Sequence, residues 1–256
     1  MRRFLLPLSL FLSVALLLAA CGSDSAEDLV NRGDRLLGEG KPAEAIESFS
    51  RAIEKDPEMA LAYYLRGVAR SFLAQYEVAI TDMNRAIDLA PEEVIYVGGR
   101  GLTYWLVGDN QRAIDDFDRV LAIDAEDTEA LNLRALARIA IGDYEAALTD
   151  VNRALELDDD EDGALLDTRA YAYLKAGRFA ESKADYDALL ARGIDDVYSL
   201  LGAGLAYRGV GEIEAGNEFL RRGLAIEVAP AEMDPQLDDL ISRAMAAPTP
   251  TDTPRG

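Results

Sequence analysis

The sequence contains no histidine and only one cysteine, and these two absences exclude several kinds of active site. Without an imidazole there is no histidine general base and no His-ligated metal site. With a single thiol, neither an intrachain disulfide nor a thiolate zinc site can form. Paired catalytic carboxylates, a phosphate-cradling glycine loop and a nucleophile elbow are not evident either. We therefore expect a protein that is not an enzyme and that uses no cofactor, metal or small-molecule substrate.

Basic residues are also scarce, with 26 Lys and Arg against 47 Asp and Glu, for a formal net charge of −21. Such a surface repels nucleic acid phosphates and anionic lipid headgroups, so we expect neither as a partner. Aromatic residues make up 7% of the chain and runs of β-branched residues are few, whereas Ala and Leu are abundant. This composition favours packed helices over strands.

The N-terminus has the pattern of a secretory signal peptide. Arg2 and Arg3 are followed by a largely apolar run from Phe4 to Ala20. A membrane-spanning helix needs about 20 apolar residues, and this run is shorter and stops at Cys21 rather than at a cluster of charges. The segment therefore predicts export of the chain.

The end of this run, Leu18-Ala19-Ala20-Cys21, resembles the lipobox of bacterial lipoproteins. The resemblance implies a signal peptide over residues 1–20, a lipid on Cys21 and a short tether over residues 21–25, with the lipid as the only contact with a membrane. Gly22 in place of Asp would favour the outer membrane of a two-membrane bacterium; otherwise the outer face of the plasma membrane is expected. Two other interpretations stay open: an ordinary signal peptide with an incidental Cys21, and an uncleaved N-terminal anchor.

A 34-residue repeat occupies most of the remaining chain. Residues 44–53 align in turn with residues 78–87, 112–121 and 146–155. In each unit a small residue in the first amphipathic stretch is followed, sixteen residues on, by a larger apolar residue in the second, as Gly33 is by Phe49. Such pairs suit two helices that cross closely. The units begin at Ala26, Ala60, Val94, Thr128, Gly163 and Val197.

This pattern resembles the tetratricopeptide repeat from Ala26 to Pro230. The resemblance implies an all-α, right-handed α-solenoid of six helix-turn-helix units over residues 26–59, 60–93, 94–127, 128–161, 163–196 and 197–230. After it, Asp234, Pro235 and apolar residues at helical spacing predict a capping helix over residues 231–246. The Pro- and Thr-rich residues 247–256 predict a disordered tail.

One departure from the family is itself periodic. Five first helices carry an arginine where an apolar residue is usual, and the residue sixteen positions later is Ser in the first unit and Asp in the other four: Arg32 and Ser48, Arg66 and Asp82, Arg100 and Asp116, Arg134 and Asp150, Arg169 and Asp185. A half-buried guanidinium requires a partner, and a carboxylate fits its planar fork. We expect a repeated Arg–Asp link, although each Asp could instead pair with the next unit's Arg, or the charges could form a solvated stripe.

In this family the inner face of the first helices lines a concave groove that holds a peptide or a partner's helix. Residue-by-residue transfer implies an apolar, aromatic groove here, with five candidate anchors: Tyr64, Phe72, Trp105, Tyr171 and Tyr198. The alternative is that several of them are interior packing residues. Some family members grip a C-terminal carboxylate with Lys and Asn, but Val30, Asp34, Tyr64 and Val68 occupy those places here. We do not expect that mode of binding.

The acidic run Asp158–Gly163 looks like the first half of a calcium loop. Its twelfth place needs a bidentate acid and holds Arg169 instead, so an acidic turn between helices is favoured.

Together these features predict a non-enzymatic scaffold or adaptor, lipid-anchored in the bacterial envelope, that binds a protein or peptide in its groove. The alternative is an accessory subunit of an envelope enzyme, a secretion system or a pilus-assembly machine, since pilotins and hydrolase adaptors have a similar architecture.

Overall fold

The computed structural model describes residues 24–161, 163–226, 239 and 242–243. The signal segment, Cys21, most of the expected capping helix and the Pro/Thr tail lie outside these residues. The helices are α2 (Ala26–Gly38), α3 (Pro42–Lys55), α4 (Ala60–Phe72), α5 (Tyr76–Leu89), α6 (Val94–Leu106), α7 (Asn110–Ile123), α8 (Thr128–Ala140), α9 (Tyr144–Leu157), α10 (Ala164–Lys175), α11 (Phe179–Ala191), α12 (Val197–Gly209) and α13 (Ile213–Leu224). Within the described residues there is no strand, and none of the helices is long and apolar enough to cross a membrane.

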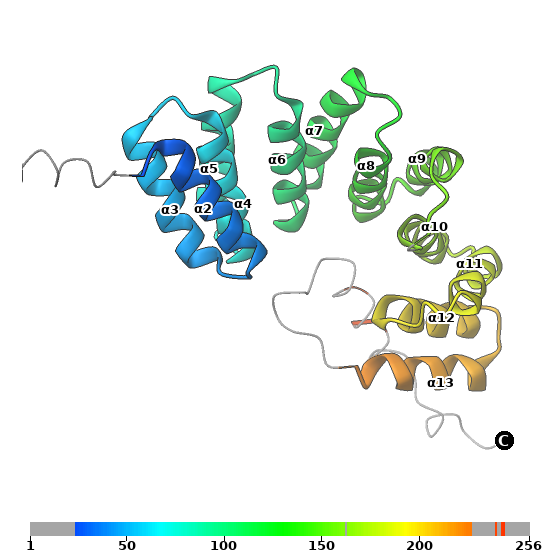
Figure 1. Cartoon of the computed structure of the whole chain (residues 1–256). Coiled ribbons are helices and arrows are strands. Elements are labelled where there is room, and N and C mark those ends of the chain that lie inside the picture. Colours follow the sequence, from blue (N-terminus) through cyan, green and yellow to red (C-terminus); the bar gives the residue numbers. More distant parts are fainter. Residues whose placement is uncertain (1–23, 162, 227–238, 240–241, 244–256) are drawn as a thin grey trace, which may run out of the picture.

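The helices pack as consecutive antiparallel hairpins, α2 with α3, α4 with α5, and so on to α12 with α13. Each second helix also packs against the first helix of the next hairpin. Figure 1 shows the hairpins stacked along an open arc. The all-α solenoid predicted from the repeat is therefore confirmed.

Close crossing of the two helices in each hairpin explains the small residues of the first helix. A Cβ atom added to Gly33 would lie 2.4 Å from the Phe49 ring, and one added to Gly101 would lie 3.0 Å from the Phe117 ring. Both phenylalanines are at most 1% exposed. Each glycine therefore leaves room for the aromatic ring that fills its hairpin.

The turns between the helices depend on two kinds of residue. One kind adopts the left-handed conformation after the first helix, and the other caps the N-terminus of the second. Gly108 ends the first helix of its hairpin with φ +82°, and Ala74 takes the same left-handed region at φ +54° in the preceding unit. The next helix then begins with a side-chain cap in several units, since Asp109 accepts a hydrogen bond from the backbone N–H of Arg112 and Asp143 accepts one from that of Ala146.

Candidate functional site

The first helices of the hairpins lie on the inner side of the arc. Consecutive first helices contact one another from α4 to α12, and Figure 1 shows α6, α8, α10 and α12 facing the space that the arc encloses. We call the inner side of these helices the groove. It carries two hollows that differ in chemistry.

The N-terminal half of the groove is mainly apolar. A hollow of about 390 Å³ lies between α4, α6 and α8, and its lining includes Tyr64, Ile95, Gly98 and Leu102. The Tyr64 ring stacks at a tilt on Tyr96, with 4.8 Å between ring centroids. Ile95 is 59% exposed, which is unusual for a large aliphatic side chain next to a hollow. This half can accept an apolar side chain of a partner.

The C-terminal half of the groove is polar. A hollow of about 360 Å³ is lined by residues of α8, α10 and α12, among them Asn132, Asp167, Tyr198 and Ser199. The Asn132 Oδ1 and Ser199 Oγ atoms are buried and have no hydrogen-bond partner in the described part of the chain. The polar side chains on this lining offer hydrogen-bonding groups to a peptide laid in the groove.

The five aromatic residues expected as anchors differ in exposure. Phe72 is 66% exposed, and Tyr64 and Tyr198 are half-buried. Trp105 and Tyr171 are buried, at 5% and 4% exposure. Burial of these two agrees with the alternative of interior packing, and the anchor role of the five aromatic residues stays a prediction.

Trp105 belongs to an interior cluster with Phe117 and Ala137. Trp105 lies on the first helix at the boundary between the groove face and the interior. Transfer of positions from the family does not decide on which side of this boundary its side chain lies. Ile95, in contrast, is not aromatic and was not among the expected anchors. Transfer of the family's inner-face positions does include Ile95, but only aromatic residues were chosen as anchors.

Tyr171 contacts a residue far along the chain. Its hydroxyl donates a hydrogen bond of 3.1 Å to Asp239 Oδ2, and Lys175 Nζ donates one of 3.0 Å to Asp239 Oδ1. The C-terminal part of the chain therefore contacts the inner surface of α10.

The expected Arg–Asp link is confirmed in four units. The Nε and Nη2 atoms of Arg66, Arg100, Arg134 and Arg169 donate to the two carboxylate oxygens of Asp82, Asp116, Asp150 and Asp185 at 2.6–2.9 Å. Each Asp pairs with the arginine of its own unit, so the alternative of pairing with the next unit is wrong. The stripe is also not solvated, since these aspartates are buried. Arg32, with Ser48 at the matching place, is exposed.

Each of these arginines has a second contact that the sequence analysis missed. The Nη1 atom donates to a polar side chain on the second helix of the preceding unit, for instance to Asn84 from Arg100 at 2.6 Å and to Asp118 from Arg134 at 2.6 Å. One guanidinium thus joins three helices. The bonds with Asp116 raise the pKa of Arg100, although burial alone would lower it. These charges hold the solenoid together and are not free to bind a ligand.

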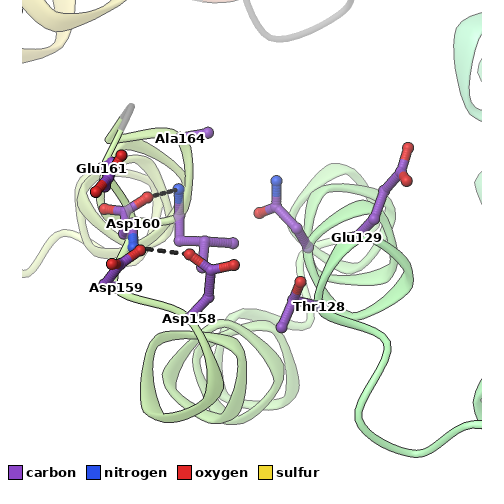
Figure 2. Close-up of a pocket in the computed structure, with 9 residues that line it drawn as sticks. Thr128, Glu129, Asp158, Asp159, Asp160, Glu161 and Ala164 are labelled. Atoms are coloured by element: carbon purple, nitrogen blue, oxygen red, sulfur yellow. Dashed lines mark hydrogen bonds between the residues drawn. The ribbon is translucent and has the colours of Figure 1, made fainter.

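The acidic run forms a helix-capping turn (Figure 2). Asp158 Oδ1 accepts a bond from the backbone N–H of Asp160, and the Asp160 carboxylate accepts bonds of 2.8 and 3.1 Å from the backbone N–H groups of Leu165 and Leu166. Asp160 is 3% exposed and has φ +53°. Its oxygens therefore satisfy the N-terminus of α10. The described residues contain no cluster of three or more His, Cys, Asp or Glu side chains suited to a metal.

Comparison with known proteins places this geometry in a family. No curated protein matches the sequence. A tetratricopeptide repeat protein from Parabacteroides merdae ATCC 43184 is 20% identical over 91% of this chain and 90% of its own, with a TM-score of 0.71. PilW, described as a widely conserved type IV pilus biogenesis factor, is 15% identical over 86% of this chain and all of its own, with a TM-score of 0.71.

A third solved structure is YrrB, described as a TPR protein with an unusual peptide-binding site. It is 20% identical over 77% of this chain and 99% of its own, with a TM-score of 0.54. At these identities the three structures show a shared fold. The sequence model of the tetratricopeptide repeat matches residues 30–93, 70–128, 99–164 and 168–225. The chain therefore belongs to the tetratricopeptide repeat family, whose fold serves as a protein-interaction scaffold.

Proposed function

We propose that this protein is a non-enzymatic adaptor that binds a protein or peptide partner in its concave groove while a lipid on Cys21 holds it to the bacterial cell envelope. The observation that carries the groove proposal is the pairing of an apolar hollow beside the exposed Ile95 with a polar hollow whose lining includes Asn132, Asp167 and Tyr198.

This pairing suits a partner segment that has both apolar side chains and free backbone groups. The apolar hollow gains by removing Ile95 and a partner side chain from water. The polar hollow gains because the side chains that line it can form hydrogen bonds with backbone groups of the partner. An extended peptide, or the end of a partner helix, offers both kinds of group.

The groove proposal is tested by crosslinking the protein in intact cells and recovering the partner. Ile95→Glu places a charge at the apolar hollow, and we expect it to remove most of the crosslinked partner. Ile213→Glu is the matched control, since Ile213 is 42% exposed at the start of the second helix α13, and no residue of α12 or α13 lines the hollow. Equal recovery with both variants would show that binding takes place elsewhere. Trp105 is a poor choice for this test because its burial makes a folding defect the first effect of substitution.

The lipid anchor is supported by the lipobox-like residues before Cys21 and by the absence of any other thiol. We expect wild-type protein to incorporate an alkyne-labelled fatty acid and to sediment with membranes. Cys21→Ser should abolish the label and release the protein. If Cys21→Ser stays on membranes, the uncleaved anchor is correct. If wild-type protein is itself soluble and unlabelled, the ordinary signal peptide is correct.

An accessory role in a larger machine is the second candidate. It is favoured by the similarity in fold to PilW, whose description names type IV pilus biogenesis. The two candidates differ in one measurement: an accessory subunit changes the activity or assembly of its purified partner when added back, whereas a positioning adaptor changes only the partner's location.

A further inference from the structure

A side chain from the C-terminal part of the chain occupies the groove at α10. Asp239 lies 64 residues beyond Lys175 and 68 beyond Tyr171, and each of its two carboxylate oxygens accepts one hydrogen bond from these two residues. The groove is therefore already filled, at this point, by a carboxylate of the same chain.

The residues that hold Asp239 form a compact carboxylate-binding arrangement. Tyr171 and Lys175 are one helical turn apart on α10, so they project from the same face. Lys175 Nζ lies 5.8 Å from the centroid of the Tyr171 ring, which places the ammonium against the ring as well as against the carboxylate. The Lys175 side chain is only 16% exposed. An ammonium and a phenolic hydroxyl, each bonded to one oxygen, stabilise the charged form of a carboxylate.

Lys175 also differs from the other cations of the first helices from α4 to α12. Arg66, Arg100, Arg134 and Arg169 are held by aspartates of their own hairpins. Arg208 donates to Asn217 on the second helix of its hairpin. The carboxylate that pairs with Lys175 comes instead from outside the twelve repeat helices. The positive charge of Lys175 is thus not needed to hold the repeats together.

The arrangement continues the polar half of the groove. Asp167, Tyr171 and Lys175 stand on successive turns of α10, and Asp167 lines the hollow that also contains Asn132 and Ser199. A segment lying in that hollow can therefore reach Tyr171 and Lys175 with a side chain. Because the chain carries 47 acidic residues against 26 basic ones, a site that attracts a carboxylate is local and contrasts with the rest of the surface.

We propose that Tyr171 and Lys175 form a carboxylate-binding subsite that receives an Asp or Glu side chain of the partner, and that Asp239 fills this subsite in the free protein. The partner is thus an acidic peptide segment that displaces Asp239 as it binds. This inference rests on the proposed function, since it assigns a partner chemistry to the same groove.

The inference is tested with the full chain and a fluorescein-labelled synthetic peptide that has the sequence of residues 234–246, followed by fluorescence anisotropy. In the wild-type protein the peptide competes with the attached Asp239. Asp239→Asn removes the competing charge, so we expect the peptide to bind that variant about tenfold more tightly, as loss of one charge-assisted contact implies. Adding Lys175→Met to Asp239→Asn should cancel the gain.

Two controls isolate the carboxylate. Lys183→Met in the Asp239→Asn background removes a lysine that pairs with Asp187 on its own helix, and it should leave peptide binding unchanged. A peptide with Asn in place of Asp239 should bind about tenfold more weakly than the original. Equal affinity of wild type and Asp239→Asn, or binding that is indifferent to Lys175→Met, would overturn the subsite. If that happens while Ile95→Glu still removes the crosslinked partner, the groove function stands and only the subsite is wrong.

Discussion

The hydroxyl of Tyr186 lies in surroundings that do not satisfy its hydrogen-bonding capacity. It is fully buried, and its hydroxyl has no hydrogen-bond partner within the described residues. The ring is pressed against Gly202, where an added Cβ would lie 2.1 Å from the Tyr186 Cζ atom. The ring fills the hairpin as Phe49 and Phe117 do in theirs, while the hydroxyl packs against Gly202 without a hydrogen bond and loses its contact with water.

We predict that Tyr186→Phe stabilises the protein at neutral pH by about 1 kcal/mol, because it removes a buried hydroxyl without a partner. Urea unfolding measures this free energy. Tyr207→Phe is the control, since Tyr207 donates a 2.6 Å bond to Asp187 and should lose stability on the same change. A loss of stability in Tyr186→Phe would show that the hydroxyl has a partner in solution.

The same residue gives a pH dependence with a definite sign. Burial raises the pKa of Tyr186 well above its usual value of 10.0. In the unfolded chain the phenol ionises near its usual pKa, so above that pH the unfolded state binds fewer protons than the folded state and stability falls. The contribution of Tyr186 is thus fully present below about pH 10 and lost above it. Tyr186→Phe should flatten this alkaline decline in urea unfolding, and an unchanged decline would contradict the assignment.

At the scale of the helices, the Arg–Asp links are polar contacts that recur between the two helices of a hairpin. Asp150 is 3% exposed and accepts bonds from both Arg134 and Arg138, the second at 2.6 Å. We predict that Asp150→Ala destabilises the protein by about 3 kcal/mol, because it removes the buried carboxylate shared by two half-buried guanidinium groups and leaves Arg134 with only the exposed Asp118. The exposed pair Arg153–Glu126 provides the contrast, and Arg153→Ala should cost less than about 1 kcal/mol.

A double-mutant cycle decides whether the link acts as a pair. Arg134→Ala combined with Asp150→Ala should cost less than the sum of the two single substitutions, because the second change removes a charge that the first has already left unpaired. Thermal and urea unfolding of the four proteins measure the coupling. Additive losses would mean that each residue stabilises the solenoid through separate contacts.

The elements also show which features a sequence can predict. The pairing of Arg66 with Asp82 follows from a constant spacing within one hairpin, where two crossing helices bring residues sixteen apart together. The further bond from Arg100 to Asn84 depends on how closely two hairpins stack, and that distance is not a property of either hairpin's sequence. The sequence left open whether Trp105 lies in the groove or in the interior, since the boundary between the two falls within one helical position, and the structure places it in the interior.

At the scale of the whole molecule, the periodicity of the sequence predicted the solenoid because each unit repeats the same helix packing with the same types of residue. First helices begin at Ala26, Ala60 and Val94, where the sequence pattern restarts. The contact of Asp239 with α10 has no counterpart in the repeat, since it joins residues more than sixty positions apart once only. Contacts of this kind, which give the groove its individual chemistry, need the structure.

The net charge of −21 leads to a prediction for the entire chain. Excess acid on the surface repels itself and destabilises the compact state, and salt screens exposed charges far more than buried pairs. We therefore predict that raising NaCl from about 10 mM to about 150 mM raises the melting temperature by about 2–4 °C, which corresponds to roughly 1 kcal/mol for a chain of this size. Circular dichroism melts at constant pH measure it.

Two variants of the acidic turn distinguish repulsion among surface charges from the loss of a helix cap. Asp159 and Glu161 are exposed, so Asp159→Asn with Glu161→Gln should raise the melting temperature at low salt and reduce its response to salt. Asp160→Asn removes a similar charge from the cap of α10 and should lower the melting temperature at every salt concentration, since the capped N–H groups of Leu165 and Leu166 lose a charged acceptor. A melting temperature that falls as salt rises would instead mean that exposed ion pairs, rather than repulsion among the acids, dominate the surface electrostatics.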